Sequence, residues 1–103
     1  MNEKPIIITD HAAERIRERM LTRTDKLAKV ARKAWVSMVN RRTIDGKMYR
    51  EFSGRVFVFV ENPEQGVNVL VTVLNPKEEF AYGKLIMRWD VLNSAKSFPT
   101  KKT

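Results

Sequence analysis

Cysteine is absent from this 103-residue sequence, and histidine occurs once, as His11. Without cysteine the chain can form no disulfide, no thiol nucleophile and no cysteine-ligated zinc or iron–sulfur site. The single histidine rules out a His-Glu-x-x-His zinc motif, and the twelve acidic residues are scattered rather than clustered. We therefore expect neither a metal nor a cofactor.

Long apolar runs are also missing. No stretch approaches the roughly 18 to 20 apolar residues that cross a bilayer, and the apolar stretch near residue 1 is too short for a signal peptide. The glycine-rich nucleotide-binding motifs and the Gly-x-Ser-x-Gly esterase motif do not occur. We expect a cytoplasmic protein without membrane partners, with one domain over residues 1–93 and a flexible basic tail over residues 94–103.

Positive charge is what the sequence has in excess. Its 20 Lys and Arg against 12 Asp and Glu give a formal net charge of +8. Residues 1–50 hold thirteen of the cations and six of the anions, so the first half carries a net +7. Such one-sided placement favours a polyanionic partner, above all a nucleic acid. The alternative is a solvated basic surface that only keeps the protein soluble.

Helical periodicity occupies the first half of the chain. Asp10 is suited to cap a helix over about residues 11–20, and a second helix begins near Thr24 and Asp25 and ends near residues 40–42. The second helix has a basic strip opposite its apolar face. The residues expected to contact phosphates are Arg19, Lys29, Arg32, Lys33, Arg41 and Arg42.

Strand patterns follow the helices. Residues 5–9 favour a short strand, and residues 47–52, 55–60 and 67–74 favour three longer ones, with a fourth strand or a packed extension over 81–89. The Ser53-Gly54 pair and the loop over residues 62–66 predict antiparallel hairpins. The strand over 67–74 is apolar on both faces, so its Thr72 is expected to be a buried or cleft-facing hydroxyl.

A family resemblance rests on residues 8–19 and on two strands. The segment from Ile8 to Arg19 resembles the opening helix, HAxxRxxER, of small RelE/BrnT-like, toxin-like proteins, and residues 54–60 and 70–74 are similar to the paired strands of that family. The resemblance covers roughly residues 6–76 and suggests a phage-encoded member. It implies an α+β, RelE-like fold in which two N-terminal helices pack on a small curved antiparallel sheet of three to four strands.

Candidate catalytic residues come from two places. His11 and Arg15 are four residues apart on one helix face, where an imidazole can move a proton beside a phosphate-binding guanidinium. Tyr49, Arg50 and Arg55, with Lys47, provide the mixture of phenol and cations that the resemblance implies for a RelE-like site. Strand alternation places Tyr49 and Arg50 on opposite faces, so convergence requires help from neighbouring strands. The alternatives are that His11 only packs or bonds to backbone, and that the strand residues form a solvated edge.

The function expected from these observations is that of a small basic RNA-binding protein, with metal-independent endoribonuclease activity of the RelE-like type as its extension. Two alternatives remain open at this stage. One is a non-catalytic phage accessory protein that binds and inhibits a host protein, and the other is a plain nucleic-acid-binding module. A ribosome, an antitoxin-like protein and a second copy of the chain are further candidate partners.

Overall fold

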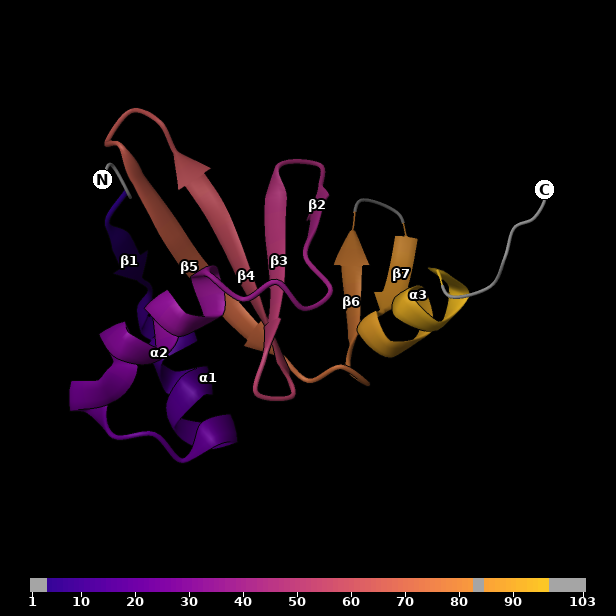
Figure 1. Ribbon diagram of the computed structural model, residues 1–103, viewed down its shortest axis with the longest axis horizontal. Coiled ribbons are helices and arrows are strands. Elements are labelled where there is room, and N and C mark those ends of the chain that lie inside the picture. Colours follow the sequence, from indigo (N-terminus) through magenta and orange to yellow (C-terminus); the bar gives the residue numbers. More distant parts are fainter. Residues whose placement is uncertain (1–3, 83–84, 97–103) are drawn as a thin grey trace.

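The computed structural model describes residues 4–82 and 85–96, which form two sheets and three helices (Figure 1). The main sheet has the strand order β1-β5-β4-β3-β2, with β1 parallel to β5 and every other pair antiparallel. Strands β6 and β7 form a separate two-stranded sheet. In chain order the elements are β1 (Ile6–Ile8), α1 (Asp10–Met20), a 3-10 turn (Thr24–Lys26), α2 (Leu27–Trp35), β2 (Arg42–Ile44), β3 (Lys47–Phe52), β4 (Arg55–Asn62), β5 (Val67–Leu74), β6 (Glu79–Tyr82), β7 (Leu85–Arg88) and α3 (Trp89–Lys96).

The expected fold class is wrong. The main sheet is mixed and five-stranded rather than antiparallel with three to four strands, and a second sheet and a third helix accompany it. Two strands account for the larger sheet. The residue 5–9 segment becomes β1 because the open edge of β5 accepts it: the Asn68 N–H donates to the Pro5 carbonyl. Strand β2 forms because Asp45 and Gly46 both adopt positive φ and make a two-residue hairpin turn into β3.

Helix α1 ends at Met20 as expected, but its cap and the bounds of α2 differ from the expectation. Thr9, not Asp10, caps α1: its side chain accepts a hydrogen bond from the Ala12 N–H. Helix α2 ends at Trp35, several residues before the expected end near residue 40. Alanine and large aliphatic residues on one face of each helix are buried, so the two helices lie together against the main sheet (Figure 1).

The main sheet has an apolar cluster on each face. The helix-covered face buries Phe57, Phe59, Leu70 and Val73 against α1 and α2. The opposite face buries Tyr49, Val56 and Val58 against Trp89 at the start of α3, with Phe80 of β6 beside them. Phe57, Phe59 and Trp89 are at most 1% exposed, so they do not serve as platforms for nucleic-acid bases.

A β-bulge at Val71 changes the direction of the side chains along β5. Val58 pairs with Thr72, whereas the next residue of β4, Phe59, pairs with Leu70. Because Val71 is the extra residue, Leu70 and Val73 point to the helix-covered face while Thr72 points to the opposite one. The bulge therefore explains why Thr72, in a strand that is apolar on both faces, directs its hydroxyl away from the helices.

The region from residue 79 to residue 96 holds more secondary structure than expected. The region expected to be a fourth strand, residues 81–89, contributes to the β6–β7 hairpin and to the first residue of α3. Helix α3 also includes residues 94–96, which the sequence assigned to a flexible tail, and residues 97–103 lie outside the described residues. Within the described ranges, no helix has both the length and the apolar character needed to cross a membrane.

Candidate nucleic-acid interface

The exposed face of α2 forms a basic strip, the α2 strip, made of Lys29, Arg32 and Lys33. Leu27, Ala31 and Ala34 face the core, so helical geometry turns the three cations outward. Helix α2 contains no Asp or Glu, and no described carboxylate pairs with Lys29 or Lys33. The strip is therefore a local concentration of positive charge.

The segment after α2 continues the basic surface. Arg41 is exposed, and its guanidinium lies 3.1 Å from the Met38 sulfur. Arg42 begins β2 and is half-buried. Met38 and Val39 are exposed next to Arg41, so this segment mixes apolar and cationic side chains. Of the six expected phosphate contacts, five lie in α2 and in the chain that follows it.

The structure places His11, an expected catalytic residue, beside a hydroxyl group. Its Nε2 lies 3.0 Å from the Thr72 Oγ1, which is hydrogen-bond distance. The imidazole is exposed at the first turn of α1, and Thr72 is half-buried on β5. The two side chains can share a proton, because a threonine hydroxyl both donates and accepts hydrogen bonds. We call them the His11–Thr72 pair.

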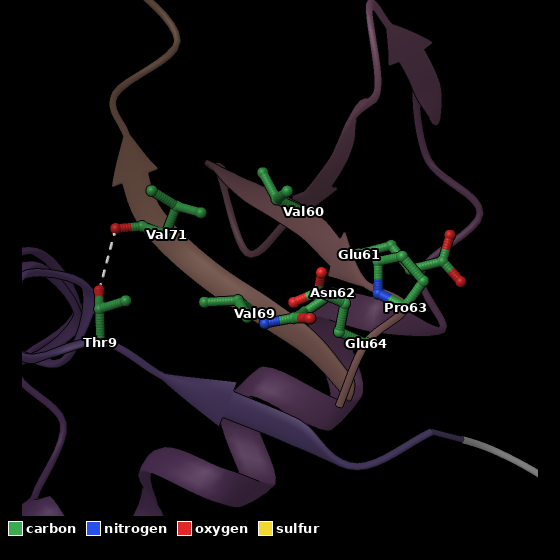
Figure 2. A pocket seen from close by; sticks show the side chains of 8 residues that line it. All are labelled: Thr9, Val60, Glu61, Asn62, Pro63, Glu64, Val69 and Val71. Atoms are coloured by element: carbon green, nitrogen blue, oxygen red, sulfur yellow. Dashed lines mark hydrogen bonds between the residues drawn. The ribbon is translucent and has the colours of Figure 1, made fainter. Parts of the chain in front are cut away.

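Thr9 positions the His11–Thr72 pair. Its Oγ1 donates to the Val71 carbonyl at 3.1 Å, as Figure 2 shows, and its backbone N–H donates to the Leu70 carbonyl. The same oxygen accepts from the Ala12 N–H at the start of α1. The Thr9 side chain therefore joins the start of α1 to the β-bulge. Because His11 lies in the first turn of α1 and Thr72 follows the bulge, this link fixes the distance between them.

A cavity of about 170 Å³ lies beside Thr72 on the face opposite to α1 and α2. Its polar lining is Lys47, Tyr49 and Thr72, and the rest is aliphatic or aromatic. The Tyr49 ring is only 2% exposed because it stacks on Trp89 at 5.5 Å and contacts Phe80. Burial raises the pKa of the Tyr49 phenol, so the phenol is a poor general base near neutral pH.

Arg19 binds an acidic partner rather than facing open solvent. The Arg19 Nη1 donates to the Glu78 Oε1 at 2.7 Å. Burial alone would raise the pKa of Glu78, but hydrogen bonds from the Asn75 N–H and Arg19, together with the charges of Arg19 and Arg15, lower it. Arg19 is therefore a structural cation between α1 and the loop after β5, which argues against the phosphate contact expected for it.

Arg50 and Arg55 are built into the framework. Arg50 is 6% exposed on the helix-covered face, where it lies over the Trp35 ring at 4.6 Å and donates to the Trp35 carbonyl. Burial lowers the pKa of Arg50, and the nearby Arg41 charge adds to this effect. Arg55 donates to the Arg19 carbonyl at the last turn of α1. The structure therefore does not bring these two arginines together with His11.

Sequence reasoning identified His11 but did not join it to Thr72. It expected Thr72 to be a buried or cleft-facing hydroxyl, and the missing step was the parallel contact that places residue 72 beside residue 11. In the described ranges, no group of three or more His, Asp or Glu is arranged to hold a metal ion. The chain matches no protein-family model, no curated protein and no solved structure.

Proposed function

We propose that the protein binds RNA through the α2 strip. The observation that carries the proposal is that α2 exposes Lys29, Arg32 and Lys33 and holds no carboxylate. Phosphate contacts of this kind release condensed counterions, so they provide affinity without a deep pocket. Arg41 extends the same charge beyond the helix. The proposal rests on these charges and not on the family resemblance.

RNA rather than DNA is the proposed target because of the His11–Thr72 pair. An exposed imidazole at hydrogen-bond distance from a hydroxyl is suited to exchange a proton with a further hydroxyl. The 2′-hydroxyl, which DNA lacks, is the group that such a pair recognises or activates. Phosphate contacts along α2 alone do not distinguish the two nucleic acids.

The binding proposal is tested by measuring affinity for a labelled single-stranded RNA at several salt concentrations. Each phosphate contact on a single strand contributes about 0.7 to the slope of log affinity against log salt, so Lys33→Ala should reduce the slope by about 0.7 and Lys29→Ala/Lys33→Ala by about 1.4. Lys77→Ala is the control, because Lys77 is exposed beside Glu78 and away from α2. A salt-independent affinity, or equal losses in all three variants, contradicts the proposal.

A second candidate function is metal-independent RNA cleavage, and the His11–Thr72 pair is the observation that favours it. In this reaction the 2′-oxygen attacks the adjacent phosphorus, the bond to the 5′-oxygen breaks, and the products are a 2′,3′-cyclic phosphate and a 5′-hydroxyl. His11 accepts the 2′ proton, and the leaving 5′-oxygen takes a proton from solvent water. Arg15, one helical turn from His11, is the nearest cation on α1 for the phosphorane charge. Arg50 and Arg55 have no part in this scheme.

The cleavage candidate is tested with labelled RNA in the presence of EDTA, with and without ribosomes. His11→Ala should reduce the rate by about 100-fold or more if His11 transfers the proton. Arg23→Ala is a suitable control, because Arg23 is exposed and paired with Asp25. Cleavage that survives His11→Ala removes this candidate and leaves the binding proposal intact.

A further inference from the structure

One half of the sheet face opposite α1 and α2 is open, although the other half is covered. Around Tyr49, Val56 and Val58 this face is buried under Trp89 and Phe80. Toward β1 it forms a groove of about 510 Å³ over β4 and β5, walled by the hairpin loop at residues 62–64 (Figure 2). We call this surface the valine groove. Its lining residues are Thr9, Val60, Glu61, Asn62, Pro63, Glu64, Val69 and Val71.

The floor of the valine groove continues into a row of aliphatic side chains across three strands. Ile7 pairs with Val69, and Val69 pairs with Val60, so these three share one face. Ile7 is 49% exposed and Val71, the bulged residue beside them, is 36% exposed. Four neighbouring aliphatic residues on an open sheet face are a typical feature of a protein-binding site.

Acidic side chains stand at the rim of the valine groove. Glu61 and Glu64 line it, and no Lys or Arg does. Glu61 pairs with Lys4 but is still 49% exposed, and Glu64 is exposed in the hairpin loop. Lys4 already pairs with Glu61, so the groove is left with one acidic group for a ligand, Glu64. The complement of the groove is an apolar surface with a basic flank.

The shape of the valine groove fits a helix. Neighbouring strands lie about 4.8 Å apart, so the row from Ile7 to Val60 spans about 10 Å, which matches the 10–12 Å diameter of an α-helix with its side chains. Helix α3 already packs Trp89 and Leu92 on the covered half of the same face. A helix in the groove would extend that layer over the remaining strands.

We propose that the valine groove binds a basic amphipathic helix of a partner protein. Apolar side chains of that helix occupy the surface of Ile7, Val60, Val69 and Val71, and a flanking Lys or Arg residue pairs with Glu64. This inference is independent of RNA binding, because it uses a different face and the opposite charge.

The test uses a synthetic 14-residue helical peptide of leucine and lysine, and a control peptide with glutamate in place of lysine. Methyl signals of the isotope-labelled protein are followed by NMR during titration. The lysine peptide should shift the methyl signals of Ile7, Val60, Val69 and Val71 and leave Val91, a more exposed valine on α3, unchanged. The glutamate peptide should shift none of them.

Three variants locate the binding. Glu64→Lys and Val71→Ser should each lower the affinity for the lysine peptide by about tenfold. The first reverses a charge at the rim, and the second removes an apolar contact at the centre of the groove. Val91→Ser is the matched control and should not change the affinity. Because Glu64 and Val71 are exposed, all three should keep the thermal unfolding midpoint of the unaltered protein to within a few degrees.

Several results overturn the proposal. Equal shifts at Val91 and in the groove indicate nonspecific adhesion of the peptide, and equal binding of the glutamate peptide removes the role of the acidic rim. Groove shifts caused by single-stranded RNA assign the surface to nucleic acid. A dimer of the free protein in sedimentation that Val71→Ser dissociates assigns it to a second copy of the chain.

Discussion

His11 Nε2 lies 3.0 Å from Thr72 Oγ1, although 61 residues separate the two in the sequence. The contact depends on the parallel pairing of β1 with β5, which brings the start of α1 to the second half of β5. It leaves the imidazole exposed while the hydroxyl lines a cavity. His11 can therefore exchange protons with solvent and, through Thr72, with a group bound in that cavity.

Thr72→Val should disturb His11 without unfolding the protein, because it removes the hydroxyl and keeps the shape of the side chain. If RNA cleavage occurs, its rate should fall by roughly tenfold to a hundredfold as His11 loses its fixed orientation, and Thr72→Ser should restore it. Nitrogen NMR of the imidazole checks the contact directly, since Thr72→Val should change the His11 ring signals and Thr72→Ser should not. Unchanged ring signals in Thr72→Val contradict the contact.

Thr9→Ala should destabilise the protein by about 2 kcal/mol. It removes the N-cap of α1, worth about 1 kcal/mol, and the bond to the Val71 carbonyl, worth about 1 kcal/mol. Thr9→Ser retains both hydrogen bonds and should stay close to the unaltered protein. Urea unfolding measures the difference, with Thr43→Ala, an exposed threonine on the edge strand β2, as the control. Equal stabilities of Thr9→Ala and Thr43→Ala contradict the joint role of Thr9.

Arg50→Ala should reduce the free energy of unfolding by about 2–4 kcal/mol, because Arg50 is buried on Trp35 and bonds to the Trp35 carbonyl. RNA affinity of the folded fraction should not change, since Arg50 is only 6% exposed. Urea unfolding and RNA titration at low temperature separate the two properties. If Arg50→Ala has normal stability but loses RNA affinity or cleavage, Arg50 acts in the functional site and not in the framework.

Glu78→Gln should destabilise the protein near neutral pH and not in acid. The pKa of Glu78 is lower in the folded protein than in the unfolded chain, so the ionised carboxylate stabilises the fold above the unfolded pKa. That contribution disappears as pH falls through the folded pKa. The partly exposed pair with Arg19 limits the effect to about 1 kcal/mol or less.

Urea unfolding of Glu78→Gln at several pH values measures this effect, with Glu79→Gln as an exposed neighbouring control. The unaltered protein and Glu78→Gln should become equally stable at the lowest pH values of the series. A difference that is constant over the whole pH range would show that Glu78 acts through packing or neutral hydrogen bonds instead of charge.

Local patterns in the sequence predicted several elements close to where they lie. The helix expected over residues 11–20 corresponds to α1, and the strands expected over 47–52 and 67–74 have the bounds of β3 and β5. The Ser53-Gly54 turn is confirmed, since both residues have positive φ between paired strands. The Asp45-Gly46 pair carries the same signal and predicts β2, but sequence reasoning did not use it.

Candidate site residues were less predictable, because residue type does not reveal which sheet face is covered. Strand alternation correctly separated Tyr49 from Arg50, yet only the packing of Trp89 on one face and Trp35 on the other made both of them structural. The structural roles of Arg19 and Arg55 were equally hidden in the sequence, because their partners, Glu78 and the last turn of α1, are distant in the chain.

The sequence by itself determined the absence of thiol chemistry, the net charge of +8 and the basic face of α2, because composition and helical spacing are local properties of the chain. Tertiary structure decided that β1 joins β5, that Thr72 meets His11 and that four aliphatic side chains stay open beside two glutamates. The first two relationships join segments about 60 residues apart. Such contacts depend on the summed packing of the whole chain, and no local pattern encodes them.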